Sequence, residues 1–370
     1  MRRGHNHRSP AAAGPPPSTH RPLRRIKKHL SLATRTLMRV VVAFIVGALV
    51  LLTAAQRFGN VGPWWLELSR YLPYPALLLP AGIAVLLSWR LGRGWAVASV
   101  ATLALVATLT MGLEWHGADR GSGHVRLMTY NIKAYKASQR SGGFAELAQE
   151  VALQAPDILV MQDANGLLGS PGQGAYPVGP VFGLPEVYAS GQYVVASRFP
   201  LRDCHSKRIG EQRDEVRYVH CVVDVRGTEL DLVTVHFESP RNGLNAARHE
   251  GFDGVDQWRR NYEERLAQAR ALARNLRRSW RPLIVAGDLN APELSPVIRA
   301  LLGVGLRDAY ASGGRGYGYS YGHALRVGFS FLRIDHILVS PELGVTDCFA
   351  GNPQASEHRP VIADLLLQRS

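Results

Sequence analysis

The chain has 370 residues, enough for two domains or for one large domain with additions. Its formal net charge is +14, but residues 1–39 supply ten Lys/Arg without an acid and residues 40–123 supply a net +2. The residues after 123 therefore carry a net charge of only +2. A region so close to neutral lacks the basic surface on which binding to a duplex depends, which argues against nucleic acid as a partner.

Residues 1–36 are rich in Arg, His and Pro and contain almost nothing to bury, which predicts a disordered basic tail. This tail has two interpretations. It could contact anionic lipid and set the topology, or it could be a solvated extension with no role beyond orientation.

Residues 37–115 contain three apolar runs, Val40–Ala55, Tyr71–Trp89 and Trp95–Leu113. Each is close to the roughly 20 residues that a helix needs to cross the hydrocarbon core of a bilayer. None shows the polar stripe of an amphipathic helix, and Trp and Tyr residues gather at the ends of the runs, as they do at membrane interfaces. The sequence therefore predicts about three transmembrane helices.

Two alternatives remain for these runs. The first run could be a signal peptide cleaved near Thr53-Ala54-Ala55. The second and third runs could form a re-entrant pair, because Pro73, Pro75 and Pro80 make the second run irregular.

The positive charges predict the orientation of a multi-pass protein in the cell membrane. The basic N-terminus and the short loop that carries Arg90 and Arg93 are expected on the cytoplasmic side. Three spans then place everything after Leu113 on the extracytoplasmic side.

Two of the three cysteines flank a predicted β-hairpin formed by residues 202–209 and 216–225. Cys204 and Cys221 are equidistant from the turn centre, Gln212-Arg213, so a symmetric hairpin places them directly opposite each other. In an oxidising compartment they could form a cross-strand disulfide. The alternative is two free thiols, and Cys348 has no partner in either case.

From residue 124 onward, short apolar runs alternate with turn residues and a few helices, which predicts an α/β domain over residues 124–370. A helix is expected from Asp256 to Ser279, with Trp258 and Leu266 on its apolar face. The expected strands are Val125–Tyr130, Ile158–Gln162, Tyr193–Ser197, Leu230–His236, Leu283–Gly287 and Ile334–Val339.

Polar residues occur repeatedly at the ends of these strands. A single Asp or His at a strand end is more often a cap or a turn residue, but six such positions are difficult to explain in that way. The positions are Asn131, Gln162-Asp163, His236, Asp288-Leu289-Asn290, Asp335-His336 and Ser356-Glu357-His358.

These motifs resemble, in order and in spacing, those of the endonuclease/exonuclease/phosphatase superfamily. The resemblance covers essentially all of residues 124–370. It implies a four-layer sandwich of two packed β-sheets flanked by helices. The motifs that carry it are Met128-Thr129-Tyr130-Asn131-Ile132, Ser197-Arg198-Phe199-Pro200, Gly287-Asp288-Leu289-Asn290-Ala291-Pro292, Arg333-Ile334-Asp335-His336 and Ser356-Glu357-His358-Arg359-Pro360.

The same resemblance implies roles for five residues in phosphoester hydrolysis. His358 matches the histidine that contacts the phosphoryl oxygen or acts as general base, and Asp335 matches the carboxylate that orients it. Asp288 matches the residue that aligns the attacking water, and Asn290 matches the ligand of a phosphoryl oxygen. His236 matches the second histidine of the nuclease-like and phospholipase-like branches.

The implied cofactor is Mg²⁺, with Mn²⁺ as an alternative, and the implied metal residues are Asn131, Asp163 and Glu357. Here the chain departs from the family pattern. Relatives usually carry Glu at position 163 and Asp at position 357, so one carboxylate is a methylene shorter and the other a methylene longer.

A domain tethered by membrane spans and weakly charged favours a membrane lipid or a lipid-linked phosphate as substrate. The arrangement also resembles the VanJ-type bacterial membrane proteins associated with glycopeptide resistance, which implies a lipid-carrier phosphate or pyrophosphate. The alternative enzyme is an extracytoplasmic nuclease, for which Tyr317-Gly318-Tyr319-Ser320-Tyr321 would be a DNA-contacting loop rather than a Gly/Tyr-rich rim. A third hypothesis is a binding protein that only sequesters its ligand.

Overall fold

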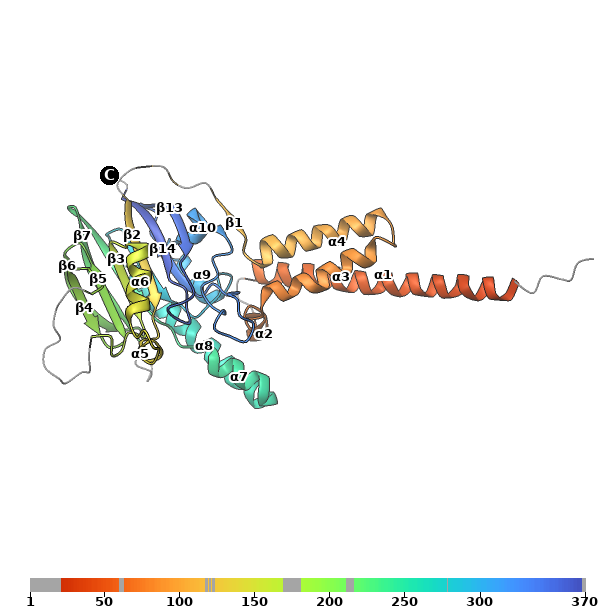
Figure 1. Cartoon of the computed structure of the whole chain (residues 1–370), viewed down its shortest axis with the longest axis horizontal. Helices are drawn as coiled ribbons and strands as arrows, with labels where there is room; N and C mark the ends of the chain where they lie inside the picture. Colours follow the sequence, from red (N-terminus) through yellow and green to blue (C-terminus); the bar gives the residue numbers. More distant parts are fainter. Residues whose placement is uncertain are drawn as a thin grey trace, which may run out of the picture.

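The computed structural model describes residues 21–59, 63–116, 119, 121, 124–168, 181–210, 216–277 and 279–367. Within these residues, a group of helices projects from one side of an α/β domain (Figure 1). Residues 1–20 of the expected tail lie outside the described residues. The remainder of that tail is helical, because helix α1 (Arg21–Phe58) begins well before residue 37. No Gly or Pro interrupts residues 23–46, so nothing in the sequence ends the helix earlier.

Two of the three expected spans are long apolar helices. Leu32–Phe58 and Arg93–Thr110 are long and apolar enough to cross a membrane, by length and composition alone. The second expected span is shorter, since only Tyr74–Ser88 forms an apolar helix. It opens with a 3-10 turn at Tyr74–Leu77, where Pro75 lies in the first helical turn, and continues as α3 (Leu78–Ser88). The expectation of three full-length spans is therefore not confirmed.

These helices pack against one another through small and apolar side chains. Leu49 of α1, Ala81 of α3 and Val106 form a common buried cluster. Thr53 and Thr110 are joined by a hydroxyl–hydroxyl hydrogen bond of 2.7 Å. Close contacts of this kind are typical of helices that associate in lipid. The remaining elements of this region are α2 (Trp64–Ser69), α4 (Arg93–Leu105) and a π-helical turn (Val106–Thr110).

The α/β domain contains two six-stranded sheets. In the first, the strands run β10 (Arg307–Asp308), β12 (Asp335–Val339), β9 (Leu283–Asp288), β8 (Thr228–Val235), β7 (Arg217–Val225), β6 (Leu201–Arg208). In the second, they run β13 (Leu343–Ala350), β14 (Val361–Leu367), β2 (His124–Asn131), β3 (Ile158–Gln162), β5 (Tyr193–Ser197), β4 (Glu186–Ser190). A small pair, β1 (Glu114–Trp115) with β11 (Arg315–Gly316), joins the end of the helical region to the domain.

The two sheets face each other across the largest hydrophobic core, which includes Leu127, Val160, Val223 and Ile284. Helix α6 (Ala145–Gln154) covers the outer face of the second sheet, and α8 (Gly251–Leu276) with α9 (Pro296–Leu302) covers that of the first. Burial on both faces explains why the central strands read as continuous apolar runs. The expected sandwich of two sheets flanked by helices is confirmed. The shorter helices are α5 (Ala134–Ser138), α7 (Arg241–His249) and α10 (Ala309–Gly313).

All six strands expected from the apolar runs are present, with bounds that differ by two residues or fewer. The expected helix from Asp256 is α8, which begins earlier at Gly251 and buries the predicted apolar face, including Trp258 and Leu266.

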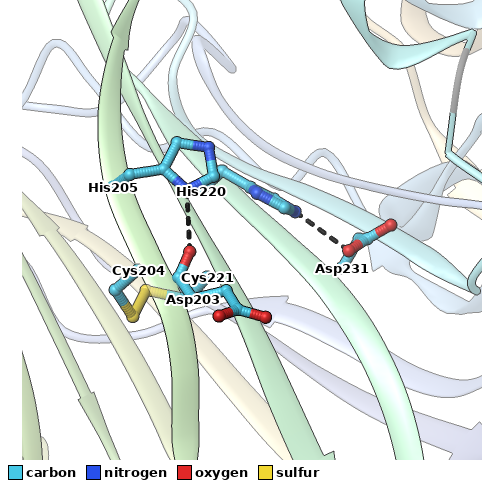
Figure 2. Close-up of a disulfide and its surroundings, with 6 residues drawn as sticks. All are labelled: Asp203, Cys204, His205, His220, Cys221 and Asp231. Atoms are coloured by element: carbon cyan, nitrogen blue, oxygen red, sulfur yellow. Dashed lines mark hydrogen bonds and ion pairs between the residues drawn. A yellow bond between two sulfur atoms is a disulfide. The ribbon is translucent and has the colours of Figure 1, made fainter.

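The hairpin register predicted from the cysteine positions is observed next to the turn, and a bulge between Arg202 and His205 shifts it by one residue farther along, where Arg202 pairs with Val222. His205 pairs with His220 and Arg208 with Arg217, so each pair is symmetric about the predicted turn centre, which itself lies outside the described residues. Cys204 and Cys221 form a disulfide with an S–S distance of 2.05 Å, as Figure 2 shows. Cys348 is a buried free thiol.

Candidate active site

The polar residues predicted at the strand ends meet at one edge of the sandwich. Asn131 and Gln162 are paired at the carboxyl ends of the parallel strands β2 and β3. In the other sheet, Asp288 at the end of β9 lies opposite Asp335 at the start of the antiparallel strand β12. Because the ends of these strands face the same edge of the sandwich, residues far apart in sequence become neighbours.

Asp288 is the centre of the cluster. Its Oδ2 accepts a hydrogen bond of 2.9 Å from Asn131 Nδ2 and lies 3.4 Å from His236 Nε2 and 3.8 Å from His358 Nε2. Asp335 Oδ2 lies 2.9 Å from His358 Nδ1, on the other side of the same imidazole. Asp288, Asp335 and His358 are all buried. The structure therefore brings both expected aspartates and both expected histidines together.

Asn290 is held beside this cluster by its backbone. Its φ is +47°, a conformation that asparagine tolerates better than most residues. Its backbone N–H donates to Asp288 Oδ1 at 2.9 Å, and its side-chain Nδ2 donates to the carbonyl of Phe237 at 2.9 Å. The carbonyl of Asn290 accepts a hydrogen bond of 2.7 Å from the hydroxyl of Tyr71, which belongs to the helical region.

The carboxylates around His358 shift its pKa in the opposite direction to burial. Burial favours the neutral imidazole, but the carboxylates of Asp335 and Asp288 outweigh this effect and raise the pKa of His358. Burial likewise opposes the charge on Asp335, while His358 and the Ser320 hydroxyl lower the pKa of Asp335. Both shifts favour the charged forms of this hydrogen-bonded pair.

His236 is oriented by residues that the sequence did not indicate. Its Nδ1 lies 2.7 Å from Gln192 Oε1, and its backbone N–H donates to the Tyr193 hydroxyl at 3.0 Å. Gln192 lies immediately before β5, and nothing in its sequence context marks it as a functional residue.

The first of the expected metal carboxylates is paired with a lysine. Lys133 Nζ contacts Asp163 Oδ2, and Asp163 Oδ1 lies 3.7 Å from His236 Nδ1. Burial raises the pKa of Asp163, but His236 and Lys133 outweigh it, so the net shift is downward. Lys133 lies two residues after Asn131, and only this position in the motif could have indicated it.

The second expected metal carboxylate has a comparable environment. Glu357 Oε1 accepts a hydrogen bond of 2.6 Å from Lys136 Nζ, and Glu357 Oε2 lies 3.6 Å from Arg241 Nη2. This Oε2 is buried and has no hydrogen-bond partner among the described residues. With Arg241 as an ion-pair partner but no hydrogen bond, this oxygen keeps a lone pair that a divalent cation could use. The donor chemistry of Glu357 and Asp163 therefore fits a hard cation.

A second set of metal donors lies at the centre of the cluster. Ligand atoms of Asp288, Asp335 and His358 lie within 4.8 Å of one another. However, Asp335 and His358 already bond each other, and Mg²⁺ prefers oxygen ligands. The Glu357 oxygen that accepts no hydrogen bond is the stronger indication of where a cation would bind.

The rim of the site comes from the Gly/Tyr-rich segment. The Ser320 hydroxyl accepts a hydrogen bond of 3.2 Å from the backbone N–H of Asp335. Tyr321 packs against His358 with a centroid separation of 4.8 Å. A cavity of about 560 Å³ lies behind this rim and is lined by Tyr317, Tyr319 and Arg359 among others.

Among solved structures, the chain is similar to an endonuclease/exonuclease/phosphatase from Beutenbergia cavernae (18% identity, 66% of this chain and 72% of that chain, TM-score 0.48). It is also similar to humanized TDP2 of D. rerio (16%, 66% and 100%, 0.49) and to the human Nocturnin catalytic domain with bound sulfate (18%, 66% and 93%, 0.44). No curated protein matches the chain. The model of the endonuclease/exonuclease/phosphatase family, whose members are divalent-metal-dependent phosphoesterases and nucleases, matches residues 128–358. That match spans more than half of the sequence and every residue of the cluster around Asp288, so the chain belongs to the endonuclease/exonuclease/phosphatase family.

Proposed function

We propose that the protein is a membrane-anchored, divalent-metal-dependent phosphoester hydrolase whose substrate is a lipid-linked phosphate or pyrophosphate, or a phospholipid. The observation that carries this proposal is the bond of 2.7 Å between the Tyr71 hydroxyl and the carbonyl of Asn290. Tyr71 lies between two apolar helices, so the candidate site adjoins the region expected in the membrane.

The surface next to the site supports a substrate embedded in a membrane. The loop that follows Tyr321 exposes Leu325, Val327 and Phe329, whose relative accessibilities are 41%, 44% and 45%. Exposed apolar side chains on neighbouring positions of one loop are typical of surfaces that contact lipid or another protein. Because Tyr321 contacts His358, a lipid held by this loop would present its headgroup near the cluster.

The fold also supports an extracytoplasmic site. Residues 59 and 63–72 contact the catalytic domain, so the loop after α1 and the domain are on the same side of the membrane. If α1 crosses the bilayer, the domain lies opposite the basic N-terminus, whether α3 and α4 span the membrane or form a re-entrant pair. The Cys204–Cys221 disulfide is consistent with an oxidising compartment.

The two carboxylates beside His358 indicate its role in the proposed reaction. Because both carboxylates favour its charged form, His358 is positioned to donate a hydrogen bond to a phosphoryl oxygen rather than to take a proton from water. Asp288 then orients the attacking water. The Asn290 amide holds a second phosphoryl oxygen, and the His236 imidazole lies on the other side of Asp288, with its Nε2 3.4 Å from Asp288 Oδ2. Attack by water forms one P–O bond as the bond to the leaving oxygen breaks, and a proton passes to that oxygen.

We assign the cation to Asp163, Glu357 and Asn131, with Mg²⁺ as the expected ion and Mn²⁺ as the alternative. When bound, such an ion neutralises phosphoryl charge and stabilises the leaving oxygen. Lys133 and Lys136 hold the two carboxylates charged and in place.

The proposed substrate class is tested by offering polyprenyl pyrophosphate, phospholipid and plasmid DNA side by side to the full-length protein in detergent with Mg²⁺. We expect release of phosphate or headgroup from a lipid and intact plasmid. His358→Ala should lower the rate about 100-fold or more. Rapid cleavage of the plasmid with untouched lipid would overturn the proposal. If His358→Ala abolished hydrolysis but preserved the cellular phenotype of the protein, sequestration would be favoured.

One observation favours the nuclease as a second candidate. Tyr317 and Tyr319 stack in parallel, with centroids 5.4 Å apart and an interplanar angle of 9°, beside the cavity that Arg359 also lines. Stacked aromatic rings next to a guanidinium are a common platform for unpaired bases. The plasmid in the same assay, together with a single-stranded oligonucleotide, tests this candidate.

A further inference from the structure

The backbone carbonyl of Asn290 accepts two hydrogen bonds, one from each side of the boundary between the helical region and the catalytic domain. The Tyr71 hydroxyl donates at 2.7 Å, and Arg265 Nη1 of α8 donates at 2.8 Å. Arg265 Nη1 also contacts the Tyr71 hydroxyl. Three groups from distant parts of the sequence therefore meet at one carbonyl.

Tyr71 and Arg265 pack against each other and against Trp258. Arg265 is fully buried, lies 5.3 Å from the ring centroid of Tyr71 and 5.4 Å from that of Trp258, and donates from Nε to Asn261 Oδ1. In the part of the chain that the structure describes, it has no carboxylate partner, and its Nη2 has no hydrogen-bond partner. A buried guanidinium without an acid is costly.

A buried ion pair anchors the same loop to the catalytic domain. Arg70 Nη1 and Glu67 Oε2 are 2.8 Å apart, and neither side chain is exposed. Glu67 Oε1 accepts a hydrogen bond of 2.6 Å from the hydroxyl of Ser295, which also caps α9. Ser295 ends the loop that begins at Asp288. The loop between the apolar helices therefore contacts residues 288–295 at two points, at Asn290 through Tyr71 and at Ser295 through Glu67.

Asn290 needs this support because of its conformation. A non-glycine residue at φ +47° is less favourable than an extended or helical one, and it persists when surrounding contacts fix it. Its own side chain fixes one end through Phe237, while its carbonyl depends on Tyr71 and Arg265.

We infer that Tyr71 is a positioning residue for the reaction: with Arg265 it fixes the peptide of Asn290, so the loop between the first two apolar helices is a working part of the active site. This inference rests on the proposed function. Its consequence is that catalysis depends on how the domain is seated on its membrane region, because a shift of the loop moves Asn290 relative to Asp288.

The test compares Tyr71→Phe with Tyr74→Phe in the full-length protein. Each substitution removes one buried phenolic hydroxyl, and the two positions are three residues apart. The Tyr74 hydroxyl has no hydrogen-bond partner among the described residues, so Tyr74→Phe is a matched control. Loss of one hydrogen bond predicts a fall in kcat of about 3- to 10-fold for Tyr71→Phe, with KM unchanged. Tyr74→Phe should change neither kcat nor KM.

A second readout does not depend on activity. Hydrogen–deuterium exchange of peptides covering residues 287–295 should be faster in Tyr71→Phe than in the wild type and unchanged in Tyr74→Phe. A merely structural role would lower Tm and raise exchange throughout the domain. Unchanged kcat and unchanged local exchange in Tyr71→Phe would overturn the inference. If the wild type hydrolyses none of the substrates offered, the proposed function fails, and exchange alone still decides whether Tyr71 holds the loop.

Discussion

The imidazole of His358 lies between two carboxylates, which favour its charged form. Burial favours the neutral ring, but Asp335 at 2.9 Å and Asp288 at 3.8 Å raise the pKa of His358. If the imidazolium donates to a phosphoryl oxygen, the titration of His358 does not reduce activity at low pH. Activity is lost as the pH rises through the pKa of His358, because the ring then loses the donated proton.

Asp335→Asn should therefore have two effects. Removing the negative charge lowers the pKa of His358, so the descending limb of the pH–rate profile should move to lower pH. The maximal rate should fall about 100-fold or more, because the imidazole loses the group that orients it. The profile of kcat against pH tests the first effect. A limb at unchanged pH would show that another group controls it.

At this scale the sequence indicated the side chains that form the cluster but not their partners. His236, Asp288, Asn290, Asp335 and His358 could be predicted because each lies in a motif at a strand end. Tyr71 and Arg265 could not, since they are separated from Asn290 by 219 and 25 residues and no local pattern marks them. The placement of the Asp163 and Glu357 carboxylates beside lysines also required the folded chain.

A buried ion-pair network braces strands β10 and β12 under the active site. Arg333, just before β12, binds Asp308 of β10 at 2.6 Å and Glu293 of the Asp288 loop at 3.0 Å. His336 Nε2 donates to the carbonyl of Ala291 in the same loop at 2.9 Å. Arg333 and Asp308 are 4% and 7% exposed. Burial opposes the charge on Asp308, but Arg333 and His336 outweigh it and lower the pKa of Asp308.

Arg333→Met should destabilise the domain strongly. Removing one partner of a buried pair leaves uncompensated charge and costs about 3–5 kcal/mol, which corresponds to a fall in Tm of about 10 °C for a domain of this size. Because the pKa of Asp308 is lowered in the folded state, its stabilising contribution is present above its unfolded pKa of about 3.9 and is lost as the pH falls below it. The difference in Tm between wild type and variant should therefore be largest near pH 7 and should narrow below about pH 4.

Arg259→Met provides the control for this measurement. Arg259 forms an exposed i,i+4 pair with Glu263 on the same domain, so its loss should leave Tm unchanged. An equal decrease in Tm for both variants would contradict the explanation by burial.

Secondary structure could be predicted where one physical signal dominated. The central strands bury both faces and read as apolar runs, and the hairpin register followed from the symmetric placement of its cysteines. Strand β4 was missed because it is a half-buried edge strand, and β14 because Asp364 interrupts its apolar run. The start of α1 was missed because residues 1–36 have little to bury and were predicted to be disordered, although no Gly or Pro between 23 and 46 breaks a helix.

At the scale of the molecule, the helical region projects from one side of the catalytic domain (Figure 1). The loop after α1 and the segment after Val106–Thr110 both return to that domain, through Tyr71 and through the β1–β11 pair. Arg70 and Glu67, which follow α1, form a buried ion pair, so their charges do not indicate on which side of the membrane this loop lies. The contacts of this loop with the catalytic domain therefore support the orientation more strongly than its charges do.

The number of spans remains a prediction, and the tip between α3 and α4 distinguishes the alternatives. The apolar helix Tyr74–Ser88 is about 22 Å long, at about 1.5 Å per residue, against a hydrocarbon core of about 30 Å. Arg90 and Arg93 are exposed at its end. If the pair crosses the bilayer, these arginines reach the cytoplasm. In a re-entrant pair, these arginines would lie within the membrane and would reach neither surface.

Arg90→Cys provides the measurement, because Cys204 and Cys221 form a disulfide and Cys348 is buried, so the introduced thiol is the reactive one. A membrane-impermeant maleimide should not label this thiol in intact cells. The same reagent should label the thiol in inverted vesicles. A cysteine at Ser138, an exposed position of the catalytic domain, should show the opposite pattern. Labelling of Arg90→Cys in neither preparation would indicate a re-entrant pair. Labelling of Ser138→Cys only in inverted vesicles would place the catalytic domain in the cytoplasm and contradict an extracytoplasmic site.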